Sequence, residues 1–96
     1  MRLMMEVVIP VEKGNAAVSD GSLQKAFEDF EKEAKPEAAY FFVREGKRAA
    51  LFVFETMHQG ELVRLNEPFF VALHAEVRIT PVLVAEELQG NLQVKA

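Results

Sequence analysis

The order of its apolar segments constrains this chain more than any other feature of the sequence. Four of these segments have the two-residue period or the continuous apolar run of a strand, namely residues 3–11, 38–44, 49–55 and 76–84. The segments between the first pair and between the last pair instead place apolar residues three and four apart, as an amphipathic helix does. The order strand–helix–strand–strand–helix–strand predicts an α+β domain.

The first helix is bounded by residues that begin and end helices. We expect it to begin near Asp20-Gly21-Ser22, where Asp20 or Ser22 can cap it, and to stop at Lys35-Pro36. Residues 12–19, which contain a glycine turn signal, are expected to form a connection. The buried side of this helix is expected to consist of Leu23, Ala26, Phe27, Phe30 and Ala34.

The second helix is expected to follow Gly60 and to be interrupted. Pro68 lies within its apolar stripe, so we expect a kink or a break near Asn66-Glu67. After the last strand, residues 85–90 indicate a short terminal helix that Gly90 would stop. The buried side of the second helix is expected to consist of Leu62, Leu65, Phe69, Ala72 and Leu73.

The connections between the strands predict the sheet. Right-handed crossovers place strand one between strands three and four, which gives an antiparallel sheet of order 4-1-3-2 with both helices on one face. The 96 residues are enough for one such domain, spanning 1–96. The opposite face of a sheet of this kind is normally wet, and its strands then alternate between apolar and polar residues.

The strands of this chain do not alternate in that way. Residues 40–43, 51–54 and 82–84 are apolar on both faces. Burying one large apolar side chain contributes roughly 1.5–3 kcal/mol, so a second exposed apolar face would drive association. We expect a second copy to cover that face, sheet against sheet. The alternative is that the terminal segment folds back over it.

Several stretches carry a resemblance to a known superfamily. They are residues 9–12 with 14–17, 35–41, 46–48, 67–70, and 80–82 before 86–88. In these stretches the chain resembles small stand-alone members of the dimeric α+β barrel superfamily, whose domains have the ferredoxin-like βαββαβ fold. The resemblance implies a ferredoxin-like sheet that pairs with a second copy into a barrel. It implies no particular reaction.

Glu6 and Arg78 are charged residues within apolar strands. Strands one and four should be antiparallel neighbours, so the two side chains can meet on the face away from the helices. In a partly dry interior they could bind or polarise a small acid or a carbonyl group. The alternative is a structural ion pair that fixes the register of the strands or the geometry of a dimer.

Three further residues are candidates for chemistry or for binding. His58 follows the third strand in a loop, where it could act as an acid or base near neutral pH, or could simply face solvent. Tyr40 is the single tyrosine and could donate a hydrogen bond into the interior. Phe52, with its neighbouring phenylalanines, could line an apolar pocket. The alternative for Tyr40 is a core aromatic with its hydroxyl at the rim, and for Phe52 it is core packing or a dimer contact.

Composition excludes several classes of function. The chain has no cysteine and no metal-ligand spacing, so we expect no thiolate chemistry, metal or cofactor. A net charge of −4 without a basic cluster argues against nucleic acid as a partner. No apolar run approaches the roughly 20 residues of a membrane span, and no signal-peptide pattern is visible. We therefore expect a cytoplasmic protein without a membrane partner.

Three functions are compatible with these features. The favoured one is a homodimer that binds a small apolar or mildly acidic molecule in the barrel interior, against Glu6, Tyr40, Phe52 and Arg78. The second, which the resemblance suggests, is a cofactor-independent enzyme of isomerase or monooxygenase type acting on a hydrophobic substrate. Its acid, base or anchor would then be Glu6, His58 or Arg78. The third is a structural or interaction dimer without a ligand.

Overall fold

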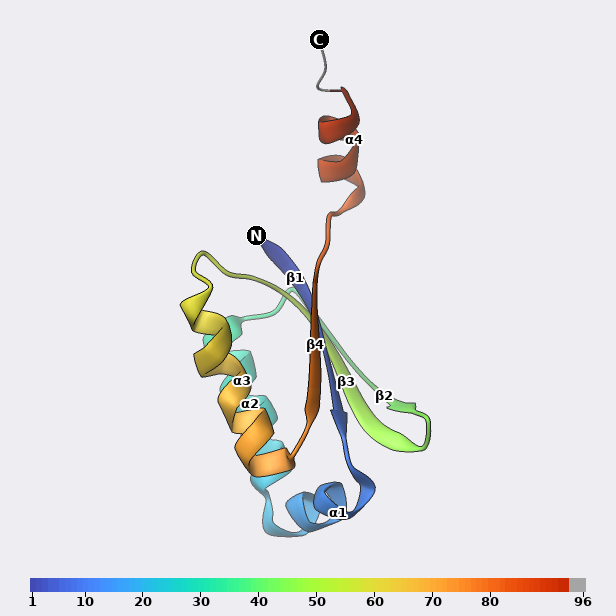
Figure 1. The fold of residues 1–96 in the computed structure, drawn as a ribbon, viewed down its shortest axis with the longest axis vertical. Coiled ribbons are helices and arrows are strands. Elements are labelled where there is room, and N and C mark those ends of the chain that lie inside the picture. Colours follow the sequence, from blue (N-terminus) through green and yellow to red (C-terminus); the bar gives the residue numbers. More distant parts are fainter. Residues whose placement is uncertain (94–96) are drawn as a thin grey trace.

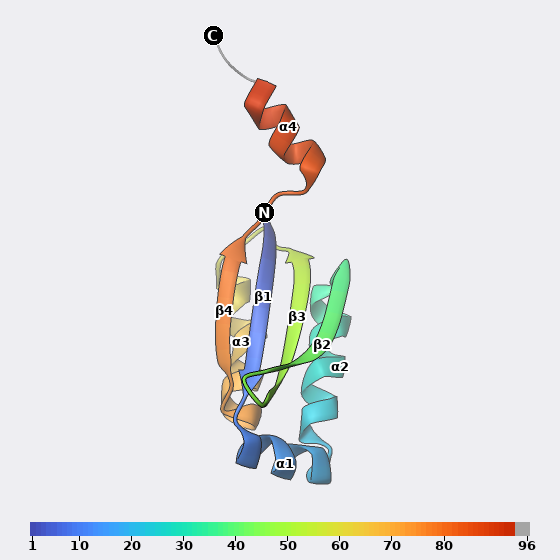
Figure 2. The same cartoon turned by 90° about the vertical axis from the view of Figure 1, so that its right-hand side faces the viewer.

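The computed structural model describes residues 1–93 and has one sheet with helices packed on one of its faces. Its elements are β1 (Arg2–Ile9), α1 (Val11–Asp20), α2 (Ser22–Ala34), β2 (Ala38–Arg44), β3 (Lys47–Glu55), α3 (Gly60–Leu73), β4 (Glu76–Pro81) and α4 (Ala85–Gln93). The antiparallel sheet has the order β2-β3-β1-β4, which read from β4 is 4-1-3-2. Helices α2 and α3 cover the same face (Figures 1 and 2).

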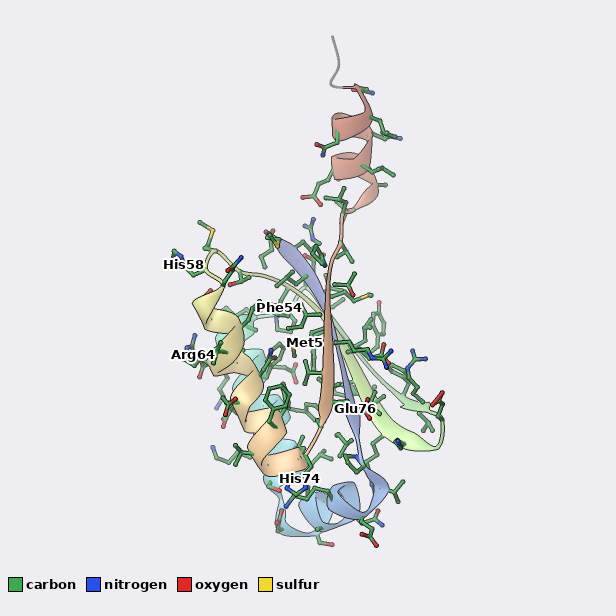
Figure 3. All side chains as sticks on the ribbon, viewed as in Figure 1. Met5, Phe54, His58, Arg64, His74 and Glu76 are labelled. Atoms are coloured by element: carbon green, nitrogen blue, oxygen red, sulfur yellow. The ribbon has the colours of Figure 1, made fainter. Side chains whose placement is uncertain are left out.

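The core lies between the sheet and these two helices. On β1, the side chains of Leu3, Met5, Val7 and Ile9 are each at most 2 % exposed, whereas the residues between them are half-buried on the opposite face. This is the two-residue period of a strand with one face in the core. Figure 3 shows Met5 and Phe54 in the layer between the sheet and the helices. The rings of Phe30 and Phe52 meet there, with their centroids 4.5 Å apart.

The expected connection over residues 12–19 is wrong, because residues 11–20 form helix α1. Pro10 precedes the helix with a φ of −58°, and its carbonyl accepts a hydrogen bond from the Gly14 amide at 2.8 Å. Gly14 is buried, and a Cβ atom there would lie 2.7 Å from the Arg48 guanidinium. The glycine therefore permits close packing within a helix and does not mark a turn. The break comes at Gly21, whose φ is 81°.

The break expected in the second helix near Asn66-Glu67 is also wrong. Helix α3 continues through Pro68 from Gly60 to Leu73. Leu65 and Phe69 are buried on either side of the proline, so both halves pack on the same core. That packing offsets the backbone hydrogen bond that proline cannot donate.

The last strand and the terminal helix also differ from their expected bounds. Strand β4 ends at Pro81, three residues before the predicted end, because proline interrupts the ladder. Helix α4 runs past Gly90 to Gln93, so this glycine does not stop it.

The terminal segment does not fold back over the sheet. Helix α4 projects beyond the end of the sheet at which β1 begins (Figures 1 and 2). Its first turn is tied to the body by an ion pair between Glu87 and Arg2, and Glu87 also accepts a hydrogen bond from the Val84 amide at 3.0 Å. Within residues 1–93, the face of the sheet away from α2 and α3 therefore has no covering element.

The attachment of α4 should depend on pH. The Val84 amide, and then the Arg2 guanidinium, lower the pKa of Glu87 below its ordinary value of 4.5. A carboxylate with a lowered pKa stabilises the folded arrangement above that ordinary value, and the stabilisation is lost as pH falls through the lower one. We expect the protection factor of the Val84 amide, measured by NMR hydrogen exchange and corrected for the intrinsic rate at each pH, to fall at acid pH. Glu87→Ala, which removes the acceptor, should show the lower protection already at pH 7, whereas Glu86→Ala should not.

Candidate functional site

The uncovered side of the sheet is called here the open face. Its residues alternate with the core residues and come from all four strands. They are Arg2, Met4, Glu6 and Val8 on β1, Ala38, Tyr40, Phe42 and Arg44 on β2, Lys47, Ala49, Leu51, Val53 and Glu55 on β3, and Glu76, Arg78 and Thr80 on β4. The central row across the sheet is Tyr40–Leu51–Glu6–Arg78. A carboxylate and a guanidinium are thus neighbours in the middle of the face, next to the apolar Leu51 and Tyr40.

The β2–β3 hairpin curls over this face. Figures 1 and 2 show its tip leaving the plane of the sheet on the side away from the helices and passing in front of β1. The tip is a two-residue turn in which Glu45 and Gly46 have φ values of 52° and 79°. Left-handed turns of this kind match the twist of the strands that they join. The curl gives the open face a concave shape.

The curl brings Arg44 to Glu6. Its guanidinium forms an ion pair with the Glu6 carboxylate and lies 5.3 Å from the centre of the Phe42 ring. The Glu6 side chain is 19 % exposed, whereas that of Arg44 is 51 % exposed. The pair therefore crosses over β3 and holds the hairpin above the face.

A polar hollow of about 150 Å³ lies beneath the hairpin. It is lined by Glu6, Val8, Arg44, Glu45, Lys47, Glu76 and Arg78. Glu76 points to this side of the sheet in Figure 3. Within residues 1–93, Glu6 is paired with Arg44, but Arg78 forms no ion pair. The guanidinium of Arg78 is therefore available to an anionic group.

The structure tests the placement of Glu6 and Arg78. They are direct register partners on neighbouring strands and lie on the open face, as expected. The ion pair of Glu6, however, is made with Arg44 and not with Arg78. Sequence reasoning missed Arg44, although this residue has the same phase along β2 as Tyr40 and Phe42.

The two aromatic candidates lie on opposite faces. Tyr40 is on the open face and its side chain is largely solvent-exposed. Phe52 is fully buried on the helix side, in register with Met5 and Ala39. Its predicted place beside Glu6 is wrong, because the phase of Leu51 and not that of Phe52 matches the open face. The ring of Phe52 stacks on Phe69 of helix α3 at 6.5 Å.

His58 is not brought near the other candidates. It is exposed in the loop between β3 and α3, at the opposite end of that helix from His74 (Figure 3). Its carbonyl accepts a hydrogen bond from the Thr56 hydroxyl at 3.1 Å. A small hollow of about 60 Å³ beside it is lined by loop residues 56–59 with Met1, Leu3 and Leu62, and not by Glu6 or Arg78.

The part of the chain that the structure describes has neither a group of metal-ligating side chains nor a membrane-spanning helix. In residues 1–93, no three histidine or acidic side chains are grouped as metal ligands would be. No helix in this range has the length and apolar character needed to cross a membrane.

Replacing Glu6 by glutamine should leave the fold intact. The pair with Arg44 is partly exposed, and such pairs contribute about 1 kcal/mol or less. We expect urea denaturation to show a fall in the free energy of unfolding of about that size. Arg44→Gln should give the same loss, and the double variant should lose no more than either single one. A loss of several kcal/mol would instead show that Glu6 is a structural element of the monomer.

Comparison with known proteins bears on the fold. No protein-family model matches the chain, and no curated protein is similar enough to match. Among solved structures, a de novo designed protein, Ferredog-Diesel, is similar with a TM-score of 0.51 and 13% sequence identity. The similarity covers 84% of this chain and 85% of the designed one. At that identity it supports the fold alone, a small α+β domain of the ferredoxin-like kind.

Proposed function

We propose that this protein is a homodimer that binds a small molecule between two open faces. The observation that carries the proposal is the concave open face, which combines uncovered apolar side chains with a charged centre. A second copy placed sheet against sheet would enclose this surface and form an α+β barrel. The polar hollows of the two copies would then open into one interior.

The apolar side chains of the open face supply the drive for association. Tyr40 is 61 % exposed, and Met4, Phe42, Leu51 and Val53 are half-buried in the single chain. Covering side chains of this size contributes roughly 1.5–3 kcal/mol for each one that passes fully from water to an interior. The charged residues of this face lie in the hollow under the hairpin and at the other end of the sheet, where Arg2 is paired with Glu37 and Glu87. The apolar side chains between these two groups can therefore be covered without burying unpaired charge.

The chemistry of the hollow indicates the class of ligand. Arg78 has no anionic partner within residues 1–93, whereas Glu6 is neutralised by Arg44. A guanidinium in a partly enclosed site binds carboxylates through charge-assisted hydrogen bonds. The apolar residues nearby favour a ligand with a hydrophobic body. We therefore propose a small apolar molecule that carries one acidic group.

Native mass spectrometry of the freshly purified protein tests both parts of this proposal. We expect a species of twice 10.8 kDa that carries a reproducible additional mass. The same sample measured under denaturing conditions should show the unmodified chain. Arg78→Gln should remain a dimer but lose the additional mass, whereas Arg64→Gln on helix α3 should keep it. A monomer would contradict the proposal, and a dimer without bound mass would retain only the association.

A further inference from the structure

The C-terminal arm, defined here as residues 82–93, extends the molecule beyond a compact domain. The longest dimension is 57 Å and the radius of gyration is 15.3 Å, whereas a compact chain of this length has a radius of about 12.5 Å. Leu83, Leu88 and Leu92 on the arm are 58, 48 and 69 % exposed. An isolated helix of this length is marginal in water, so a helix here needs a packing partner.

An apolar edge hollow of about 190 Å³ lies between helix α2 and strand β2. It is lined by Ile9, Leu23, Phe27, Phe41, Phe42, Arg48 and Ala49. Phe41 is 58 % exposed there, and its ring meets that of Phe27 at 5.4 Å. The edge hollow thus offers uncovered aromatic surface with a cation, Arg48, at its border.

The arm cannot reach the edge hollow of its own chain. Strand β4 ends beside Leu3, whereas the hollow lies at the Ile9 end of β1, roughly 20 Å away along the strand. It also lies three strand spacings across the sheet, about 14 Å further. Three extended residues and one turn of helix carry Leu88 at most roughly 16 Å from Pro81.

We propose that the C-terminal arm of each copy docks in the edge hollow of a second copy that runs antiparallel to it. In that arrangement, the end of the sheet from which the arm leaves lies beside the hairpin end of the partner. Leu88 and Leu92, one helical turn apart, would enter the hollow. This inference rests on the self-association proposed above and adds an exchanged segment to it.

Charge favours the edge hollow over the outer side of helix α3, which is another exposed apolar surface. The first turn of α4 carries Glu87, which is paired with Arg2, and Glu86, which forms no ion pair within residues 1–93, whereas Arg48 borders the hollow. Within residues 1–93, Arg48 bonds to the Asn15 amide oxygen at 3.0 Å and to no carboxylate. The acidic arm therefore complements the hollow.

The outer side of helix α3 offers no such complement. It also exposes apolar residues, with Val63 66 % and Val71 71 % exposed. Glu67 lies between these two valines in the helical repeat, and the one arginine of this helix, Arg64, is already paired with Glu33 and Glu61, so within residues 1–93 that surface offers no unpaired cation to an acidic arm. It therefore serves as the matched control surface in the test of the arm.

Cysteine cross-linking tests the docking directly, because the chain contains no cysteine. A full-length Leu88→Cys protein is mixed with a Phe41→Cys protein under mild oxidation, and the mixed disulfide is identified by mass. We expect it in at least about tenfold excess over the product of Leu88→Cys with Val71→Cys. Equal yields from the two mixtures would overturn the inference.

A second variant keeps the test independent of cysteine placement. Leu88→Gln with Leu92→Gln retains helix-forming residues but removes the apolar contacts of the arm. We expect the dissociation constant of the dimer to rise at least about tenfold, the order expected from two leucine contacts. An unchanged constant would overturn the arm exchange while leaving the sheet-face dimer intact. If the unmodified protein is a monomer, both proposals fail together.

Discussion

Replacing Leu51 by aspartate should separate the proposed dimer into monomers. Leu51 lies at the centre of the open face, between Tyr40 and Glu6 in the register of the sheet. An aspartate there would be buried beside another carboxylate, and burying an unpaired charge costs several kcal/mol. A symmetric dimer contains the substitution twice. We expect the dissociation constant to rise at least about 100-fold in sedimentation experiments, by the usual relation of free energy to affinity.

The same substitution on the opposite layer of the molecule provides the control. Val71 is exposed on helix α3, away from the open face, and Val71→Asp should leave the dissociation constant unchanged. Both variants should remain folded, because neither residue belongs to the buried core. A Leu51→Asp protein that stays dimeric at the same concentration would show that the open face is not the interface.

Replacing Phe52 by alanine should be the most destabilising of the substitutions considered. The ring is completely buried and lies within 4.5 to 6.5 Å of the rings of Phe27, Phe30, Phe41 and Phe69. Truncating a buried phenylalanine costs about 3–5 kcal/mol, through lost transfer energy and the cavity left behind. A small domain has only about 5–15 kcal/mol in total. We expect urea denaturation to show this loss.

Phe70→Ala is the matched control for this prediction. Phe70 is the next residue to Phe69 on α3 but is 43 % exposed, so its truncation should cost about 1 kcal/mol or less. If Phe52→Ala were as mild as Phe70→Ala and abolished ligand retention, Phe52 would return as a binding residue. Its position in the aromatic core argues against that result.

The strands were predictable because their patterns depend on local sequence. Residues 38–44 form a strand with the predicted bounds, and Glu6 lies opposite Arg78 as their places in two neighbouring strands require. The side of the sheet on which Phe52 lies could not be predicted in this way, because residues 51–54 are apolar in both phases and their periodicity does not distinguish the two sides. The pairing of Tyr40 with Leu51 resolves the ambiguity, because it places Leu51 on the open face and Phe52 on the opposite one.

Other features depend on contacts between distant residues. The pair between Glu6 and Arg44 exists because the hairpin curls over the sheet, which no pattern along either strand encodes. Gly14 is typical of a turn in the sequence, and its role in close packing against Arg48 depends on a contact with a distant strand. Pro68 would interrupt an isolated helix, but buried residues on both of its sides keep α3 continuous.

The left-handed turn at Glu45 and Gly46 has a consequence for the order in which the molecule folds. It joins β2 to β3 with the shortest loop in the sheet, whereas β1 pairs with β3 across about half of the chain and with β4 across most of it. Closing a long loop costs more entropy than closing a short one, and isolated hairpins form in about 1–10 μs. We therefore expect the hairpin to form early and the pairing of β4 with β1 to complete the sheet last.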